Sequence, residues 1–313
     1  MLPDAARPLS ALAAAGLLLA LSACGAGAAG SSDGRLSVVA SFYPLQYAAE
    51  QVGGDLVRVS SLTKPGAEPH DLELTPRDIV RLTKADLVVY EKGFQPAVDD
   101  AVAQAAKGTA LDVSAPAHLD LYSTETGHTD ESAAEHAARG SADPHFWLDP
   151  VRYAAVGEAI AAQLERLDPA HTSDYRMRAA GLAGRLHTLD AAFTKGLAHC
   201  TNRRIVTSHA AFGYLAKRYG FVQEAIAGVS PDSEPTASTM RDLARQVRES
   251  GASTVYAETL VSPVIAETVA REAGAKVAIL DPVEGITDAS AGRDYFEVMR
   301  ANLATLRAGQ GCS

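Results

Sequence analysis

The stretch that decides the fold lies in the middle of the chain, where residues 172–200 read TSDYRMRAAGLAGRLHTLDAAFTKGLAHC. No strand pattern interrupts it, and its large apolar residues recur at spacings of seven, four, three, four and four, along one face of a helix. These residues are Tyr175, Leu182, Leu186, Leu189, Phe193 and Leu197. At 1.5 Å per residue, a helix over 172–199 would be about 42 Å long. Gly181 and Gly184 weaken this helix, so it must be stabilised by packing against both halves of the chain. We therefore expect the helix to join two lobes.

Strand patterns alternate with helical patterns on both sides of this rod, and the two sides look alike in layout. Such alternation is typical of parallel sheets covered by helices. We therefore predict an α/β protein with an N-terminal lobe at 36–171, a linking helix at 172–199 and a C-terminal lobe at 200–313. The predicted strands are Leu36–Ala40, Val57–Leu62, Asp86–Tyr90, Arg204–Thr207, Thr254–Ala257 and Lys276–Leu280, and the predicted helices include Pro76–Thr83, Ala97–Ala106, Thr239–Ser250 and Val264–Ala273.

The first 23 residues have the pattern of a secretory signal. An apolar run from Leu9 to Ala23 follows Arg7 and is too short to span a bilayer. It ends in Leu-Ser-Ala-Cys24, which resembles the lipobox of bacterial lipoproteins, whose cysteine is lipidated. Residues 24–35 are rich in Gly and Ser and predict a flexible tether. We expect Cys24 to carry a lipid anchor on the outer face of the cell membrane, and an ordinary signal peptide is the alternative.

Composition limits the classes of function. A chain that is 47% hydrophobic and 21% charged can bury a core and is too apolar for disorder. After the signal, no apolar run approaches about 18 residues, which excludes a polytopic membrane protein. The net charge is −10 and no basic residues cluster, so we expect a protein that binds no nucleic acid. We also expect a monomer.

A polar insertion interrupts the N-terminal lobe at 115–141. It carries His118, His128 and His136 among five acidic residues and few large apolar ones. This composition predicts an exposed loop. The three histidines are candidates for a weak secondary metal site, and a solvated acidic loop is the alternative.

Two cysteines remain besides Cys24, at Cys200 and Cys312. An even pair in a secreted chain most simply forms one disulfide. The bridge would tie the C-terminal tail to the start of the second lobe, and closing a loop of that size contributes roughly 4–5 kcal/mol in the chain-entropy model. Two free thiols are the alternative, and His199 beside Cys200 leaves a metal site as another.

Position along the chain sorts the nine histidines. His70, His209 and Asp281 each follow a predicted strand, and ligands of open α/β sheets collect at the carboxyl ends of strands. These three residues therefore lie on one functional edge. His145 has no clear strand before it, but prolines flank its segment, which also holds Trp147, the only tryptophan.

Three imidazoles and one carboxylate converging from both lobes would make a four-coordinate site. Such a donor set suits Zn²⁺, which prefers tetrahedral coordination with Zn–N distances of about 2.0–2.1 Å. Mn²⁺ prefers more oxygen ligands and binds more weakly to nitrogen. Taken singly, each histidine is more often a surface or core residue than a ligand. The prediction of a zinc site therefore depends on the four residues occurring together.

Several motifs, in their order along the chain, resemble those of zinc- and manganese-type solute-binding proteins of ABC transporters. They are KPGAEPH (64–70) with Pro76, PHFWLDP (144–150), SHAAFGYL (208–215), and then ETLVSP (258–263) and LDP (280–282). The resemblance covers about residues 36–306. The two-lobed fold and rigid connecting helix of that family agree with the rod predicted above.

This resemblance implies that His70, His145, His209 and Asp281 bind the metal directly. The third position separates two branches of the family, because zinc-type receptors carry His there and manganese-type receptors usually carry Glu. His209 therefore favours zinc.

The resemblance leaves the fourth ligand open, because some members lack a close carboxylate or use water. Glu258 and Glu68 are the reserves for Asp281. Glu258 is also expected beside the ligands. Tyr43 and Trp147 are candidates for shielding the metal, although packing is the ordinary role of both.

By the same resemblance, the protein is an extracytoplasmic receptor that captures Zn²⁺ as its cargo and delivers it to an ABC permease, and it is not an enzyme. One alternative is a manganese or mixed-metal receptor. A zinc hydrolase would need an open coordination position and a general base, for which Glu258 is the only obvious candidate. A surface adhesin with a structural metal would unfold when the metal is removed. Because metal binding needs neutral imidazole, affinity should fall below about pH 6.

Overall fold

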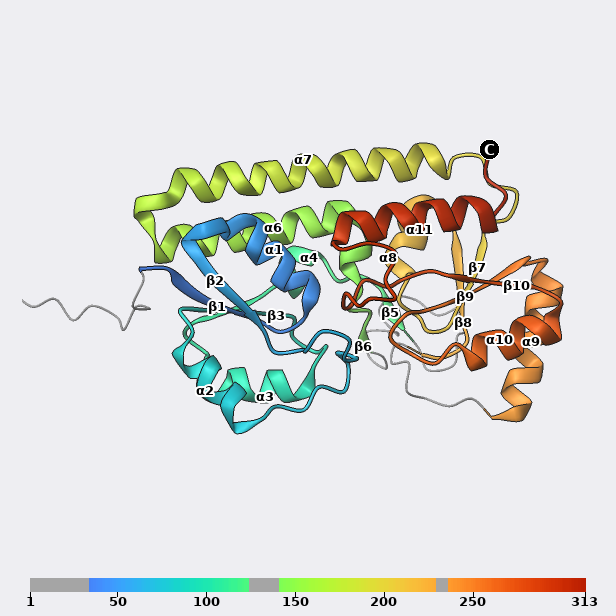
Figure 1. Ribbon diagram of the computed structural model, residues 1–313, viewed down its shortest axis with the longest axis horizontal. Coiled ribbons are helices and arrows are strands. Elements are labelled where there is room, and N and C mark those ends of the chain that lie inside the picture. Colours follow the sequence, from blue (N-terminus) through green and yellow to red (C-terminus); the bar gives the residue numbers. More distant parts are fainter. Residues whose placement is uncertain (1–33, 124–140, 229–235) are drawn as a thin grey trace, which may run out of the picture.

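The computed structural model describes residues 34–123, 141–228 and 236–313. Two lobes lie side by side, and one long helix runs along both of them (Figure 1). Each lobe holds a four-stranded parallel sheet flanked by helices. The predicted fold class is therefore confirmed.

The N-terminal lobe alternates strands and helices. Its elements are β1 (Leu36–Ala40), α1 (Tyr43–Gly53), a 3-10 turn (Gly54–Leu56), β2 (Val57–Ser61), α2 (Pro76–Lys84), β3 (Leu87–Tyr90), α3 (Pro96–Ala105), β4 (Ala110–Asp112) and α4 (Ser114–Ala117). The sheet order is β2-β1-β3-β4. Neighbouring residues of β1 face opposite sides, as the pleat requires. Val38 belongs to the main core with Leu45 of α1, and Val39 packs with Leu82 of α2 on the other face.

The C-terminal lobe repeats this arrangement. Its elements are β7 (Arg204–Thr207), α8 (Gly213–Tyr219), β8 (Val222–Ala225), α9 (Ala237–Ser250), β9 (Thr254–Ala257), α10 (Val264–Ala273), β10 (Lys276–Ile279) and α11 (Tyr295–Gly309). The sheet order is β10-β9-β7-β8. In both lobes the first strand lies between the second and the third, and the fourth strand lies beside the third. The strands that follow β1 are therefore added first on one side of it and then on the other, and the same holds for β7. Ligands of open α/β sheets bind at such switch points.

The segment between the lobes contains the longest helices. Its elements are β5 (Tyr122–Ser123), β6 (Ser141–Ala142), a 3-10 turn (Phe146–Leu148), α6 (Pro150–Leu167), a second 3-10 turn (Pro169–His171) and α7 (Thr172–Gly196). α6 lies beneath α7, and α11 lies beneath the other end of α7 (Figure 1).

α7 is the predicted linking helix, with 25 residues. The apolar face expected from the sequence is buried along its whole length, from Tyr175 to Leu197. The helix ends at Gly196, three residues before the expected end. A Cβ added at Gly196 would lie 3.1 Å from Leu303 Cδ1, so glycine allows α11 to approach closely here and also favours the end of the helix.

The predicted strands match β1, β2, β3, β7, β9 and β10 to within one residue at each end, but four of the described strands, β4, β5, β6 and β8, were not predicted. β4 has only three residues, and β8 reads VQEA with an exposed or half-buried pattern. Both are sheet-edge strands that carry too few buried apolar residues to show the expected pattern.

The polar insertion is only partly a loop, because α4, β5 and β6 overlap the ends of the expected range 115–141. His128 and His136 lie outside the described residues, as do Cys24, the signal and most of the tether.

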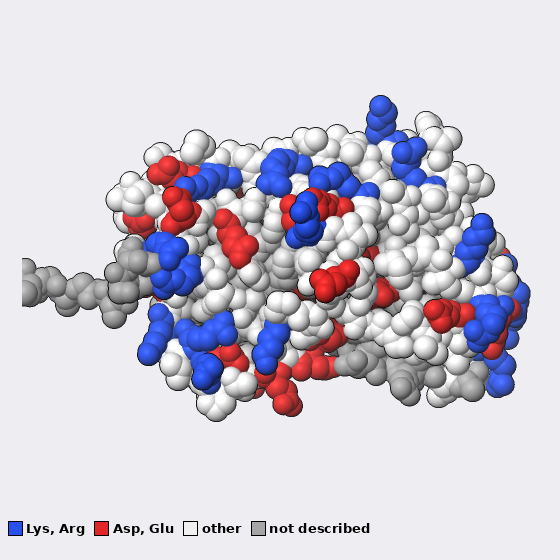
Figure 2. All heavy atoms as spheres, viewed as in Figure 1, with Lys and Arg blue, Asp and Glu red and all other residues white. Residues whose placement is uncertain are grey.

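One apolar core cluster extends through both lobes and α7, and it includes Val38, Leu186 and Tyr256. The two lobes are therefore packed on a shared interior. On the face shown in Figure 2, basic side chains are interspersed with acidic ones. Within the described residues, no helix combines the length and hydrophobicity required to cross a membrane.

Candidate metal centre

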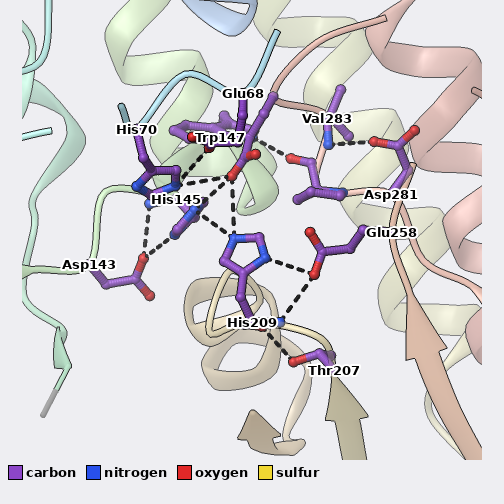
Figure 3. Close-up of polar contacts among 12 residues, drawn as sticks. Glu68, His70, Asp143, His145, Trp147, Thr207, His209, Glu258, Asp281 and Val283 are labelled. Atoms are coloured by element: carbon purple, nitrogen blue, oxygen red, sulfur yellow. Dashed lines mark hydrogen bonds and ion pairs between the residues drawn. The ribbon is translucent and has the colours of Figure 1, made fainter. Parts of the chain in front are cut away.

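Three histidines and one glutamate meet between the lobes. His70, His145, His209 and Glu284 each offer one ligand atom, and these four atoms lie within 4.8 Å of one another. His145, His209 and Glu284 are at most 1% exposed, and His70 is 9% exposed. The three histidine rings point toward one another (Figure 3). The structure thus brings together the three histidines expected from the sequence.

His70 is presented by the loop that follows β2. Gln95 at the start of α3 donates hydrogen bonds from Nε2 to the Pro69 carbonyl at 2.9 Å and to Thr63 Oγ1 at 3.1 Å, which holds both ends of this loop. The edge of the His70 ring meets the ring of Phe94, with centroids 4.6 Å apart. This is the least buried of the three histidines, so it marks the side of the site nearest to solvent.

His145 is held by its neighbour two residues before it in the chain. Asp143 Oδ1 accepts hydrogen bonds from the backbone N–H of His145 at 2.9 Å and from its ring Nδ1 at 2.8 Å. The indole of Trp147 packs against the His145 ring, with centroids 5.2 Å apart. Asp143 did not emerge from the sequence as a site residue, although its position beside Pro144 is compatible with a tight turn.

His209 is held by the strand next to its own. It follows β7, and Glu258 directly follows β9, which pairs with β7. Glu258 Oε1 accepts hydrogen bonds from the backbone N–H of His209 at 3.1 Å and from its Nδ1 at 2.7 Å. Parallel pairing of β7 and β9 therefore places the carboxylate beside the imidazole, and the expected proximity of Glu258 to the site is observed.

These two carboxylates determine which ring nitrogen faces the centre. An Nδ1–H that donates to a carboxylate leaves Nε2 as the atom available to a metal, and this is the usual arrangement of metal-binding histidines. The Nε2 atoms of His145 and His209 are 3.4 Å apart. Two ligands of a tetrahedral zinc ion with Zn–N distances of 2.0–2.1 Å are separated by about 3.4 Å. The spacing therefore fits a zinc ion bound by both rings.

Glu284 occupies the fourth position, in place of Asp281. Its Oε1 lies 2.9 Å from His145 Nε2 and 3.4 Å from the Nε2 atoms of His70 and His209. Sequence reasoning missed Glu284, because it lies five residues beyond the end of β10 in a loop without a regular pattern. The only feature of the sequence that could have indicated Glu284 is its carboxylate close to the LDP motif at 280–282.

The structure does not bring Asp281, the expected fourth ligand, into this group of ligand atoms, because its carboxylate forms other hydrogen bonds. Asp281 Oδ1 accepts a hydrogen bond from the backbone N–H of Val283 at 2.8 Å, and Oδ2 accepts one from Thr259 Oγ1 at 3.1 Å. Both oxygens therefore shape the loop that carries Glu284 and do not reach the centre (Figure 3).

The remaining candidates lie at different distances from the centre. Glu68 Oε1 is 3.8 Å from His70 Nε2. Trp147 donates a hydrogen bond from Nε1 to the Pro282 carbonyl at 2.7 Å, so it joins the two lobes beside the site. Tyr43 packs against Tyr47, with ring centroids 6.0 Å apart, and is not part of the shell around the four ligand atoms.

The predicted secondary site receives no support from the described residues. His118 is exposed and does not belong to the group of ligand atoms at the centre. Its backbone has a positive φ of 53°, and its carbonyl accepts a hydrogen bond from Arg152. The predicted disulfide is present, with Cys200 Sγ bonded to Cys312 Sγ.

Burial and charge act against each other on the buried histidines. Burial lowers the pKa of His209, but Glu258 and Glu284 overcome this effect and raise the pKa to about 10. Burial likewise opposes the charge on His145, whereas hydrogen bonds to Asp143 and Glu284 raise its pKa above the ordinary value. Burial lowers the pKa of His70, and Glu284 offsets this only in part.

Glu284 responds in the opposite direction. Burial alone would raise its pKa, but hydrogen bonds from His145, His209 and His70 hold the pKa of this carboxyl well below its usual range. The centre is therefore a buried carboxylate beside three imidazoles, of which His209, with its pKa raised to about 10, carries an extra proton at neutral pH. A divalent cation that enters must replace protons at Nε2.

Comparison with known proteins is consistent with this geometry. The family model described as "ZnuA: Zinc-uptake complex component A periplasmic" matches residues 38–309. The chain is 34% identical to the high-affinity zinc uptake system protein ZnuA of Bacillus subtilis over 301 residues, which covers 94% of each chain. It is 36% identical over 289 residues to the zinc-binding protein AdcA of Streptococcus pyogenes serotype M6, covering 88% of this chain.

The chain spans only about half of that second relative, namely 56% of the length of AdcA. Among solved structures, the Zn(II)-bound ZnuA-like domain of Streptococcus pneumoniae AdcA superposes with a TM-score of 0.72 at 32% identity, covering 88% of this chain and 99% of the domain. A family match over nearly all described residues, together with two lobes joined by a long helix, places this chain in the ZnuA family of zinc-uptake complex components.

Proposed function

We propose that this protein is an extracytoplasmic receptor that binds one Zn²⁺ ion between its lobes and delivers it to the permease of an ABC-type importer. The observation that carries the proposal is the convergence of three histidine Nε2 atoms and one carboxylate oxygen within 4.8 Å. His70, His145, His209 and Glu284 are the proposed ligands. The names of the relatives, a zinc uptake system protein and a zinc-binding protein, support the same cargo.

Zinc is favoured over manganese by the donor set. Three nitrogens and one oxygen suit a small tetrahedral ion, whereas Mn²⁺ prefers more oxygen ligands and lies at the weak end of the affinity order for nitrogen. Within the described residues, Glu284 contributes the only carboxylate oxygen that approaches all three histidines within 3.4 Å. A second carboxylate close to the centre would favour Mn²⁺ binding.

The same geometry favours a carrier over a hydrolase. A catalytic zinc ion has three protein ligands and keeps one position for water, whereas here four protein groups fill a tetrahedral shell. Glu258, the only candidate base in the hydrolase hypothesis, is engaged with His209 through its Oε1. We therefore propose transport of the ion without chemistry.

The sequence and the relatives support a location for this receptor outside the cell membrane. We propose that residues 1–23 are a signal, that lipidated Cys24 with the tether at 24–35 anchors the body outside the cell membrane, and that the receptor acts as a monomer. A streptococcal relative is named a zinc-binding lipoprotein, which supports the anchor. His118, His128 and His136 remain candidates for a weak additional metal site.

The function is tested by metal content and competition titration of the purified protein. We expect one tightly bound zinc ion per chain, and a dissociation constant for manganese at least about 100-fold larger, since the affinity order for nitrogen ligands disfavours Mn²⁺. After chelation the protein should melt at a lower temperature while remaining folded at 25 °C, because the ion binds a body that already has a core. Equal affinity for manganese would refute the zinc assignment, and unfolding on chelation would favour a structural metal.

Zinc binding should release protons and should strengthen as the pH rises. His209, with a pKa raised to about 10, is protonated at pH 7.5 before zinc binds and must be neutral afterwards. If zinc binding releases one proton, we expect the dissociation constant for zinc to fall by about tenfold for each pH unit between pH 6 and 8, and each further proton adds another factor of about ten. The pH range over which zinc affinity changes therefore extends well above pH 6, the value below which a histidine with an ordinary pKa would lose affinity.

Calorimetry in buffers of different ionisation enthalpy measures the number of protons released. The Glu258→Gln variant keeps an oxygen that can accept from Nδ1 but removes the charge that raises the pKa of His209, so it should release fewer protons at pH 7.5. A reaction enthalpy that does not change with the buffer would contradict this account.

A further inference from the structure

The residue before Glu284 has an unusual backbone conformation. Val283 has a φ of 59°, and it is one of two non-glycine residues with positive φ in the described part of the chain. A β-branched residue is disfavoured in this region because its Cβ approaches the backbone, and the population penalty is about fivefold to thirtyfold. Val283 is fully buried, so the conformation is imposed by its surroundings.

Asn302 on α11 holds the start of this turn. Its side-chain amide binds both backbone groups of Asp281, with Nδ2 donating to the Asp281 carbonyl at 2.6 Å and Oδ1 accepting from the Asp281 N–H at 3.0 Å. Asn302 is 2% exposed. This two-point contact determines the direction in which the chain leaves β10.

Two further hydrogen bonds hold the next residues. Trp147, from the segment that carries His145, donates to the Pro282 carbonyl at 2.7 Å. Asp281 Oδ1 accepts from the Val283 N–H at 2.8 Å. Four consecutive backbone polar groups, from the Asp281 N–H to the Val283 N–H, are therefore bound to buried side chains. These four groups precede the Val283 N–Cα bond, so their hydrogen bonds fix the position and direction from which the chain enters the turn at Val283.

We infer that Asn302 is a positioning residue for Glu284, and that it acts by fixing the backbone of Asp281, so that the left-handed turn at Val283 directs this carboxylate between the three histidines. The inference rests on the proposed function, because it assigns a role in presenting the fourth zinc ligand. It also gives Asp281 a role that its sequence motif alone did not indicate. Asp281 supplies the backbone groups and the carboxylate that shape the turn.

The test is zinc affinity in the Asn302→Leu variant, which keeps the approximate side-chain volume and removes both hydrogen bonds. We expect affinity to fall by about tenfold to 100-fold, the usual effect of removing an outer-shell partner of a metal ligand. Adding Val283→Gly to this variant should recover most of the loss, because glycine adopts positive φ without the steric penalty. The same Asn302→Leu substitution in a Glu284→Ala background should have little further effect.

A matched control is Asn202→Leu. Asn202 also bridges backbone groups, with Nδ2 donating to the Gly251 carbonyl and Oδ1 accepting from the Arg204 N–H, but it does not contact the Glu284 loop. It should leave zinc affinity within about twofold, as expected for independent sites. If Asn302→Leu does not fold, Val283→Pro serves instead, since proline cannot adopt positive φ and should bind zinc as weakly as Glu284→Ala.

Visible spectra of the Co²⁺-loaded proteins report the ligand set separately from stability. Asn302→Leu should shift toward the spectrum of Glu284→Ala. The inference would be overturned if Asn302→Leu bound zinc with wild-type affinity or if adding Val283→Gly recovered none of the lost affinity. It would also be overturned if Asn302→Leu reduced zinc affinity equally in the Glu284→Ala background. Failure of the wild-type protein to bind zinc would instead overturn the proposed function.

Discussion

Replacing His209 with alanine should raise the dissociation constant for zinc by about 100- to 1,000-fold. Zinc sites of four protein ligands bind with about 10–16 kcal/mol, so one ligand accounts for about 3–4 kcal/mol. His209 cannot be replaced by a neighbour, because it is fully buried and its Nδ1 already binds Glu258. The loss also leaves the Glu258 carboxylate buried without its imidazole partner, which destabilises the C-terminal side of the site.

Competition with a chromophoric chelator of known zinc affinity measures this change. The control is His187→Ala, because His187 is an exposed histidine of α7. It should bind zinc like the wild-type protein, and the pH should be the same in all titrations. Tight zinc binding retained in His209→Ala would mean that the three histidines do not act together as ligands.

Removing the disulfide should have the largest effect on stability. The bond joins residues separated by 112 positions, and in the chain-entropy model a loop of this size contributes about 4–5 kcal/mol to the free energy of unfolding. The Cys200→Ser/Cys312→Ser double variant should therefore unfold at a clearly lower denaturant concentration. Zinc affinity should change little, because Glu258 and the β7–β9 pairing still hold His209.

The matched control uses the wild-type protein with a thiol reductant. Reduction should shift its unfolding midpoint toward that of the double variant, whereas the reductant should not affect the variant itself. Equal midpoints for the oxidised wild-type protein and the double variant would show that the bond does not constrain the unfolded chain. A large loss of zinc affinity would show that the bond also shapes the site.

Much of the fold could be predicted from local patterns. The apolar face of α7, from Tyr175 to Leu197, follows helical spacing and is buried in the structure. The central strands β1, β3, β7 and β9 were found because they are short apolar runs buried in their sheets. β4 and β8 were missed because each carries a single large aliphatic residue, whereas the edge strands β2 and β10 carry two each and were found.

The candidate site was predictable to the extent that it depends on strand ends. His70 and His209 follow strands, and the end of a parallel strand points to the same edge of its sheet. Glu258 also follows a strand, but it was singled out through the resemblance of the ETLVSP motif. Asp143 and Glu284 were not, because each lies on an irregular segment whose direction depends on hydrogen bonds from residues distant in sequence. For Glu284 these come from Trp147 to Pro282 and from Asn302 to Asp281.

The sequence by itself determined the two-lobed α/β architecture, the linking helix, the disulfide pair and the strand-end positions of His70 and His209, because periodicity, cysteine number and strand-end position are local properties. His145 has no strand before it, and its selection depended on the resemblance of the PHFWLDP motif. The tertiary structure alone decided which carboxylate lies among the three histidines. Asp281 and Glu284 are three residues apart and chemically similar. The left-handed turn at Val283, held by α11 and by Trp147 from the segment that carries His145, directs Asp281 into the loop and Glu284 toward the histidines. That choice depends on contacts that exist only after the lobes have packed together.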